Sequence, residues 1–261
     1  MNYLDIAIKA ARVAGKIHKK YFNSSLKVKT KSSSFDLLTV ADTEAEDAAV
    51  SLIKRYCPDH NFLAEERRYQ KTDSEYTWII DPLDGTNNFA SGMPIFCASV
   101  ALMHKGRILA GAVYDVTRDE LFYARQGKGA YLNGRRIRVN SADTLKRSLL
   151  ITGFYYSRSE EMVRTLETIR RFFLKHILGL RRLGAAALDL CYIACGRAAG
   201  FWEFELSPWD FAAGKLIVEE AGGRVSGAGG EEVRLTEKHF IVASNKKIHQ
   251  QMLEVISEAT T

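Results

Sequence analysis

The stretch that most constrains the fold runs from Trp78 to Phe89 and reads WIIDPLDGTNNF. Its first three residues are apolar and β-prone, which predicts a buried strand. Pro82 has no backbone N–H group, so we expect sheet pairing to end there. The run Asp84-Gly85-Thr86 predicts a sharp turn into a helix, and the first N–H groups of a helix can bind an anion.

Two acidic residues, Asp81 and Asp84, flank this proline. Carboxylates held so close together repel each other unless a cation lies between them. The backbone carbonyl of Leu83 adds a hard oxygen ligand in the same turn. Oxygen ligands without histidine or thiolate favour Mg²⁺ over zinc. A cation beside an anion-binding turn predicts phosphate chemistry.

Other classes of phosphate or metal site share only parts of this pattern. Haloacid-dehalogenase phosphatases use D-x-D-G-T with a covalent nucleophile, whereas the spacing here is D-x-x-D-G-T. The glycine motifs of P-loop and dinucleotide-binding folds do not occur. Neither H-E-x-x-H nor C-x-x-C is present to indicate zinc. These classes are therefore not expected.

The composition predicts one large globular domain or two small ones. The 261 residues are 46% hydrophobic and 26% charged, with a net charge of +6. Scattered lysine and arginine residues are typical of solvated faces, although positive charge also attracts anionic substrates or nucleic acid. We expect no membrane span or signal peptide. The cysteines are interpreted as reduced thiols of a cytoplasmic protein: Cys57, Cys97, Cys191 and Cys195.

Apolar spacing divides the chain near residue 140. The first part predicts helices at 3–22 and 43–56, the latter with Asp42 as N-cap, a polar loop at 29–34, a strand at 61–64 and an antiparallel meander at 95–139. The second part predicts strands at 148–152, 200–204 and 241–243, and helices at 159–174, 185–194, 210–221 and 247–258. We expect an α+β half (1–140) and an α/β half (141–261) that form one catalytic unit.

Two details of the second half bear on the site and the surface. An isolated aspartate at the start of a helix, such as Asp210, is most often an N-cap. The helix at 159–174 is expected to bury one face, formed by Met162, Val163, Leu166, Ile169 and Phe173.

Four motifs in order resemble those of the inositol monophosphatase family: Ala64-Glu65-Glu66, Trp78–Thr86, Arg182–Ala187 and Trp209–Gly223. The resemblance covers nearly the whole chain and includes the prokaryotic branch, whose members act on inositol phosphates or also on fructose 1,6-bisphosphate. It implies a mixed α+β and α/β fold, the layered α-β-α-β-α sandwich of sugar phosphatases. The sequence departs from the family at Ala64, where glycine is usual, and at Ala185, where several members carry a hydroxyl group.

The resemblance also implies residue roles. Two or three Mg²⁺ ions would be held by Glu65, Asp81, the carbonyl of Leu83, Asp84 and Asp210. The catalytic residues would be Glu65, Asp84 and Thr86, with Thr86 and Glu65 activating the attacking water. Substrate would contact Asp84, Gly85, Thr86, Gly184, Ala185, Ala186, Glu203 and Asp210. Two further acids, Asp36 and Asp42, match residues that lie behind the metal ligands.

The activity so implied is Mg²⁺-dependent hydrolysis of myo-inositol 1-phosphate or a related sugar or polyol phosphate. Two metal ions can stabilise both the attacking and the leaving oxygen. The first alternative is a fructose-1,6-bisphosphatase or dual-substrate enzyme, in which Arg181 and Arg182 contact a second phosphate, unless they lie at a surface or dimer interface. A lesser alternative is binding to RNA or RNA polymerase. The resemblance further implies a homodimer that Li⁺ inhibits.

Overall fold

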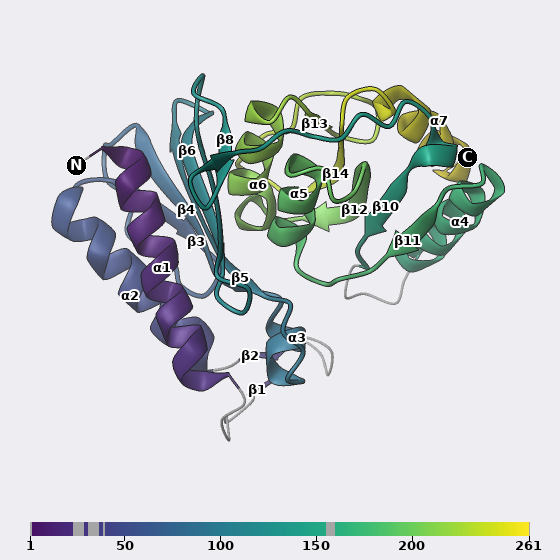
Figure 1. Ribbon diagram of the computed structural model, residues 1–261. Coiled ribbons are helices and arrows are strands. Elements are labelled where there is room, and N and C mark those ends of the chain that lie inside the picture. Colours follow the sequence, from purple (N-terminus) through teal and green to yellow (C-terminus); the bar gives the residue numbers. More distant parts are fainter. Residues whose placement is uncertain (1, 23–28, 31–36, 39, 155–159, 261) are drawn as a thin grey trace.

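Helices and sheets alternate in layers across the molecule. The computed structural model describes residues 2–22, 29–30, 37–38, 40–154 and 160–260. Helices α1 (Tyr3–Tyr21) and α2 (Val40–Tyr56) cover one face of a seven-stranded sheet. Helices α5 (Ala186–Ala194) and α6 (Pro208–Glu220) separate this sheet from a five-stranded one, whose outer face carries α4 (Glu160–Leu174) and α7 (His249–Thr260) (Figure 1). This confirms the predicted α-β-α-β-α fold.

The larger sheet contains the predicted meander. Its strands, in spatial order, are β3 (Asn61–Ala64), β4 (Tyr76–Asp84), β5 (Cys97–His104), β6 (Arg107–Asp115), β7 (Glu120–Arg125), β8 (Ala130–Leu132) and β9 (Arg135–Arg136). All pairs are antiparallel except β3 with β4. Asn133 and Gly134 both have positive φ angles, 48° and 83°, as the predicted tight hairpin requires.

The smaller sheet is mixed. Its spatial order is β11 (Gly179–Arg181), β10 (Leu149–Thr152), β12 (Gly200–Leu206), β14 (His239–Ser244) and β13 (Arg224–Ser226). β10 is parallel to both of its neighbours, whereas β14 is antiparallel to both of its own. The short strands β11 and β13 were not predicted. The proposed division near residue 140 stays a prediction.

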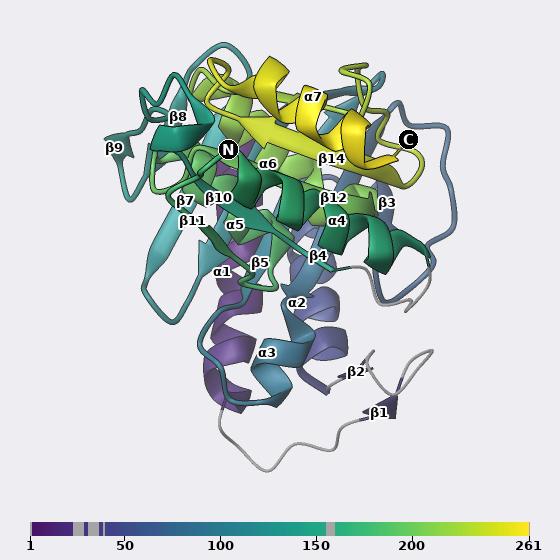
Figure 2. The same ribbon diagram turned by 90° about the vertical axis from the view of Figure 1, so that its right-hand side faces the viewer.

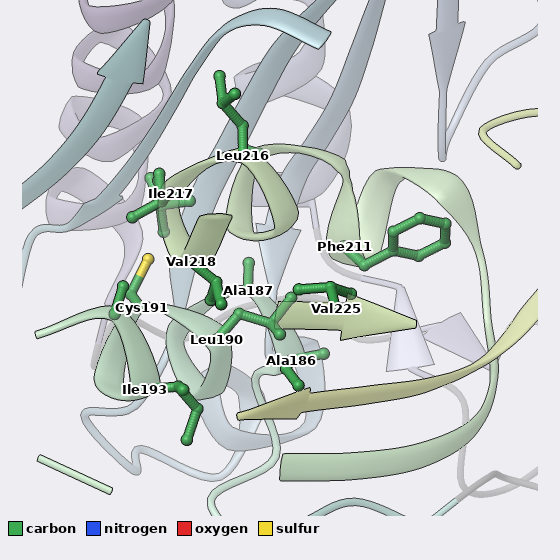
Figure 3. Close-up of a cluster of buried hydrophobic side chains, with 14 of the residues drawn as sticks. Ala186, Ala187, Leu190, Cys191, Ile193, Phe211, Leu216, Ile217, Val218 and Val225 are labelled. Atoms are coloured by element: carbon green, nitrogen blue, oxygen red, sulfur yellow. The ribbon is translucent and has the colours of Figure 1, made fainter. Parts of the chain in front are cut away.

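Four apolar clusters lie among the described residues, and three of them hold the layers together. The largest surrounds α5 and α6 between the two sheets (Figure 3), which is why α5 is apolar nearly all round. In the outer layer, α1 presents buried alanines at helical spacing, Ala7, Ala10, Ala11 and Ala14, so its backbone lies close to the sheet. The third core joins the smaller sheet to α4 and α7, which lie side by side in Figure 2. In the described part of the chain, no helix is long and apolar enough to cross a membrane.

The prediction that pairing ends at Pro82 was wrong. β4 continues to Asp84, which pairs with Cys97 of β5. The register shifts between Asp81 and Asp84, so the strand bulges at the proline and then resumes. Pro82 cannot donate to a neighbouring strand, and a bulge accommodates it without ending the ladder. The turn that follows leads, as predicted, into a short helix, α3 (Thr86–Ala90).

Two predictions near the start of α2 also need correction. The helix begins at Val40, so Asp42 lies buried in its first turn and is not the N-cap. Part of the predicted loop is a strand, β1 (Lys29–Thr30), which pairs with β2 (Leu37–Leu38). The remainder of that loop, and Asp36, lie outside the described residues.

The predicted inward face of α4 was mostly wrong: of its five residues, Ile169 packs against the core, whereas Val163, Leu166 and Phe173 are exposed. The buried residues are Thr165, Thr168 and Phe172, whereas Val163 is 60% exposed and Leu166 is 50% exposed. The two threonine hydroxyls donate to backbone carbonyls one turn earlier, at 2.8 Å each, so their burial leaves no hydroxyl unpaired. Phe172 packs on a buried tryptophan of β12. Apolar spacing alone therefore identified the helix but not the side that faces the sheet.

Candidate active site

One cavity of about 530 Å³ gathers most of the predicted site residues. It lies where β3, β4 and β12 end and where α3, α5 and α6 begin. The predicted residues on its wall are Glu65, Asp81, Leu83, Asp84, Gly85, Thr86, Gly184, Ala186, Glu203 and Asp210. Ala185 is buried and does not line the cavity.

The cavity wall also contains residues that the sequence did not single out as site residues. They are Glu66, Phe154, Glu205, Leu206, Ser207, Trp209 and Lys238. Arg182 lines the cavity too, whereas Arg181 is exposed and does not. Phe154 and Lys238 lie outside every motif, and only the fold brings them to the site.

Asp84 joins the end of β4 to the start of α5. Its Oδ2 atom accepts a hydrogen bond from the backbone N–H of Ala187 at 2.7 Å. Burial raises the pKa of Asp84 to about 6, although amide donors at Ala186 and Ala187 act in the opposite direction. The first turn of α5 therefore orients this carboxylate, and burial makes its charge costly.

Asp210 lies at the third position of α6, where Ser207 is the N-cap. The N–H of Ser207 donates to Asp210 Oδ2 at 2.7 Å. Asp210 is thus not the N-cap, which was the alternative interpretation of this residue, but it still helps to cap the helix. Burial raises the pKa of Asp210 well above its usual value, and the nearby carboxylates of Glu65 and Asp84 contribute a smaller increase.

The donors around the cavity fit a hard divalent cation in kind. They are carboxylates and one backbone carbonyl, the oxygen ligands that such a cation prefers. Burial raises the pKa of Asp84 and of Asp210, and neighbouring carboxylates add to the shift at Asp210, so a bound cation would stabilise the charged form of both. Among the described residues, no group of three or more His, Cys, Asp or Glu side chains is gathered closely enough to hold a metal ion. Metal binding at this site therefore requires the carboxylates to close around the ion.

Thr86 connects three segments of the site. Its hydroxyl lies 3.0 Å from Oδ1 of Asp42 and 3.0 Å from the carbonyl oxygen of Leu83. The preceding residue, Gly85, has a φ of +95°, and a Cβ atom there would lie 2.8 Å from the carbonyl oxygen of Ile95. Only glycine fits this turn, which sets the direction of the Thr86 side chain.

Glu203 projects from β12 over Gly153. A Cβ atom on Gly153 would lie 1.9 Å from Glu203 Oε2, so the carboxylate occupies the space that the missing side chain leaves. Burial raises the pKa of Glu203 to about 8, while Arg182 lowers it and Asp84 raises it. Gly153 was not predicted to belong to the site, because nothing in the sequence relates it to Glu203.

Asp189 is a second acid that sequence analysis missed. It lies in the otherwise apolar helix α5, fully buried, and neither carboxylate oxygen has a hydrogen-bond partner among the described residues. Burial raises the pKa of Asp189 well above its usual value, and the negative charges of Glu203 and Asp84 contribute a smaller increase. An acid within an apolar helix is informative in itself, because buried acids are rare.

Comparison with known proteins places this geometry in a family. A sequence model described as the inositol monophosphatase family matches residues 2–261. A putative Nus factor SuhB of Neisseria meningitidis serogroup B is 45% identical over 257 residues, which cover 98% of each chain. An inositol-1-monophosphatase of Synechocystis sp. is 42% identical over 260 residues, which cover 98% of this chain and 89% of that protein.

Solved structures agree with the sequence comparisons. The extragenic suppressor protein suhB from Bartonella henselae superposes with a TM-score of 0.92 at 36% identity, over 97% of this chain and 98% of that one. A structure described as IMPase/NADP phosphatase complexed with Mg²⁺ and phosphate gives a TM-score of 0.81 at 25% identity, over 94% and 90% of the two chains. The resemblance inferred from the motifs is thereby confirmed: the chain belongs to the inositol monophosphatase family.

Proposed function

We propose that the protein is a Mg²⁺-dependent phosphomonoesterase that hydrolyses myo-inositol 1-phosphate or a related sugar or polyol phosphate. The observation that carries the proposal is the convergence of Glu65, Asp81, Asp84 and Asp210 with the Leu83 carbonyl on one cavity. Family membership supports a phosphatase, and a solved relative described with Mg²⁺ and phosphate supports the metal.

In this proposal the five oxygen ligands, Glu65, Asp81, the Leu83 carbonyl, Asp84 and Asp210, would hold two or three Mg²⁺ ions. When bound, the ions would neutralise phosphate charge and make a water molecule more acidic. Glu65 accepts the proton of the attacking water. Thr86 accepts a hydrogen bond from that water, while its own hydroxyl proton is directed at Asp42. Positioning by these two residues replaces a histidine base or a covalent nucleophile.

Substrate recognition would combine backbone and side-chain groups. The N–H groups of Gly85 and Thr86 bind the phosphate. Hydroxyl groups of the substrate lie against Gly184 and Ala186 and donate to Glu203. Asp84 and Asp210 would contribute to phosphate binding as ligands of the metal ions. A role for Ala185, which is buried one residue before α5, remains a prediction from the resemblance.

The test is phosphate release from D-myo-inositol 1-phosphate in Mg²⁺ and in excess EDTA. We expect turnover only with Mg²⁺, and loss of at least about 100-fold in kcat for Asp84→Asn, because one ligand of the site is removed. The matched control is Asp73→Asn, an exposed acid in the loop before β4. Full activity in EDTA, or in Asp84→Asn, would exclude the proposed metal site.

A fructose-1,6-bisphosphatase or dual-substrate activity is the first alternative. It is favoured by Arg182 and Lys238, two cations on the wall of an otherwise acidic cavity. A second phosphate on the substrate would pair with them. Comparable kcat/KM on fructose 1,6-bisphosphate and inositol 1-phosphate would support it, and absence of bisphosphate turnover would exclude it.

A second candidate role is binding to RNA or RNA polymerase. It is favoured by the name Nus factor SuhB, which several relatives at 40–45% identity carry. Binding to RNA should weaken steeply as salt rises, since the chain carries a net charge of +6. Asp84→Asn should leave such binding intact, which separates it from the phosphatase activity. Absent or salt-independent binding to RNA, together with no capture of RNA polymerase, would remove this candidate.

We also propose that the protein forms a homodimer and that the two copies meet through the outer face of α4. That face exposes Val163, Leu166, Phe173 and Leu174, and the neighbouring strand β11 lies at a sheet edge. Acidic residues occupy the first turn of α4, and Arg171 and Lys175 lie at its end. Antiparallel packing of two copies would therefore match opposite charges around an apolar centre. We also propose inhibition by Li⁺ and a cytoplasmic location, in which the four unlinked cysteines stay reduced.

A further inference from the structure

His18, near the end of α1, contacts the backbone of the candidate metal site. Its Nε2 atom lies 2.8 Å from the carbonyl oxygen of Pro82, which is 64 residues away in the sequence. A carbonyl oxygen can only accept, so Nε2 carries the proton and donates it. The His18 side chain is fully buried and belongs to the last turn of α1. In Figure 1 this end of α1 approaches α3.

The peptide group between Pro82 and Leu83 is held at both of its polar atoms. Its carbonyl accepts from His18, and its N–H, on Leu83, donates to Oδ1 of Asp81 at 3.0 Å. The β4–β5 ladder pairs Asp81 and Asp84 but skips the two residues between them. The bulge therefore leaves this peptide without a strand neighbour on that side, and the histidine takes the place of one.

The imidazole ring is fixed by aromatic side chains around the site. Phe89 of α3 lies edge-on to it with ring centroids 6.1 Å apart, and Phe96 with centroids 5.7 Å apart. Phe22, at the end of α1, packs against both phenylalanines. A ring enclosed in this way cannot turn away from Pro82 without displacing Phe89 or Phe96.

A histidine side chain is energetically unfavourable in such an apolar environment. Nδ1 is buried and has no hydrogen-bond partner among the described residues. Leaving a buried polar atom without a hydrogen bond destabilises the folded state. A leucine or methionine would fill the space without that cost, so packing alone does not account for His18. The contact that an apolar side chain could not make is the hydrogen bond to Pro82.

We propose that His18 is a positioning residue for the metal site: it fixes the Pro82–Leu83 peptide, and with it the carboxylate of Asp81 and the Leu83 carbonyl. The inference rests on the proposed function, which assigns both groups to Mg²⁺. His18 itself touches neither metal nor substrate. Its effect is to hold two ligands in place before the ion arrives. Less free energy is then needed to order the ligands when the ion binds.

The test measures Mn²⁺ binding to the substrate-free protein through the electron paramagnetic resonance signal of free Mn²⁺. His18→Leu removes the donor and keeps the bulk, and His18→Gln restores an N–H donor. Phe22→Leu is the matched control, because it loosens the same aromatic cluster without touching Pro82. We expect His18→Leu to weaken Mn²⁺ binding about 10-fold or more, and His18→Gln to recover most of the loss. Phe22→Leu should keep the wild-type affinity, even where its melting temperature falls.

Three results separate the possible failures. Unchanged Mn²⁺ affinity in His18→Leu would overturn the positioning role, as would an equal loss of affinity in Phe22→Leu. Wild-type protein that binds no Mn²⁺ would overturn the proposed function itself. Should His18→Leu not fold, the Nε2–H resonance of wild-type His18 decides the matter: it should shift on Mg²⁺ addition with the midpoint of metal binding, and no shift at saturation would overturn the inference.

Discussion

The hydroxyl of Thr86 lies 3.0 Å from Oδ1 of Asp42, although 44 residues separate them. Both side chains are buried, so the hydrogen bond ties the first turn of α2 to the first turn of α3 in a region with little water. The same hydroxyl also reaches the Leu83 carbonyl, which lies on the cavity wall. A residue from the outer helical layer thus controls a hydroxyl group at the centre of the site.

Replacing Thr86 by alanine should lower kcat by about 10²–10⁴-fold, the usual contribution of a group that assists proton transfer. Thr86→Ser keeps the hydroxyl and should retain most of the activity. Asp42→Asn keeps an acceptor oxygen and should have a smaller effect than Thr86→Ala. Steady-state kinetics with saturating Mg²⁺ check the series. If Thr86→Ala and Thr86→Ser were equally active, the hydroxyl would have no role in the reaction.

Adding a methyl group at Gly153 should displace Glu203, because the new Cβ would lie within 2.2 Å of three carboxyl atoms. We expect KM for inositol 1-phosphate to rise about 5- to 100-fold, as for the loss of a hydrogen bond to a substrate hydroxyl. Glu203→Gln should raise KM in the same direction. The control is Gly179→Ala on β11, where the nearest atoms outside the residue's neighbours lie 3.4 Å or more from the new Cβ. An unchanged KM in Gly153→Ala would place the substrate elsewhere in the cavity.

Metal ions should stabilise the folded protein by mass action. At about 100 times its dissociation constant, Mg²⁺ adds about 2.7 kcal/mol to the free energy of unfolding, which raises the melting temperature, and EDTA removes the increase. Asp84→Asn should abolish this increase while leaving the metal-free protein at least as stable, because a buried charge is removed. Differential scanning calorimetry gives both values. A normal Mg²⁺ increment in Asp84→Asn would contradict the ligand assignment.

His249 should make the protein less stable in acid. Its Nδ1 lies 2.9 Å from the Ser244 hydroxyl and its Nε2 lies 2.8 Å from that of Ser226. Ser226 Oγ donates to the Gly227 carbonyl, so Nε2–H donates to Ser226, and Ser244 Oγ donates to an unprotonated Nδ1. The network therefore fits the neutral ring. Burial lowers the pKa of His249 from 6.5 to about 4, and the positive charge of Arg224 contributes a smaller decrease.

The sign of the effect follows from proton binding. Between pH 6.5 and pH 4 the unfolded chain binds a proton at His249 that the folded protein does not, so stability is complete above pH 6.5 and falls as pH decreases. The loss from this residue is at most roughly 3 kcal/mol. Denaturant unfolding at several pH values should show a flatter profile for His249→Gln than for wild type. Parallel profiles would show that His249 does not titrate in this range.

A charge on the outer face of α4 should dissociate the proposed dimer. Leu166 is 50% exposed and lies between the acidic and basic ends of the helix, so Leu166→Glu places two like charges at the centre of the pairing. Tyr56→Glu is the control, since Tyr56 is 51% exposed and ends α2. Figure 1 shows α2 in the helical layer on the opposite side of the molecule from α4. Sedimentation analysis should show a dimer for wild type and the control, and a monomer for Leu166→Glu. A monomeric wild-type protein would refute this interface.

Patterns confined to a few neighbouring residues were enough to predict much of the backbone. The turn at Gly85, the hairpin at Asn133-Gly134 and the buried helix α5 all follow from properties of the residues themselves. A positive φ angle favours glycine or asparagine wherever it occurs, and a helix that is apolar nearly all round must be buried. The motifs, read together, also gave the family and the layered fold.

The tertiary structure alone decided which distant residues meet. The amphipathic pattern of α4 allowed more than one buried face, and contact with Trp202 selected the one that includes Phe172. The contacts of His18 with Pro82 and of Asp42 with Thr86 span 64 and 44 residues. Local sequence predicts the backbone conformation and which segments must be buried, because both depend on neighbouring residues. It does not predict which distant residues come into contact when the layers stack, and in this protein those contacts surround the proposed metal site.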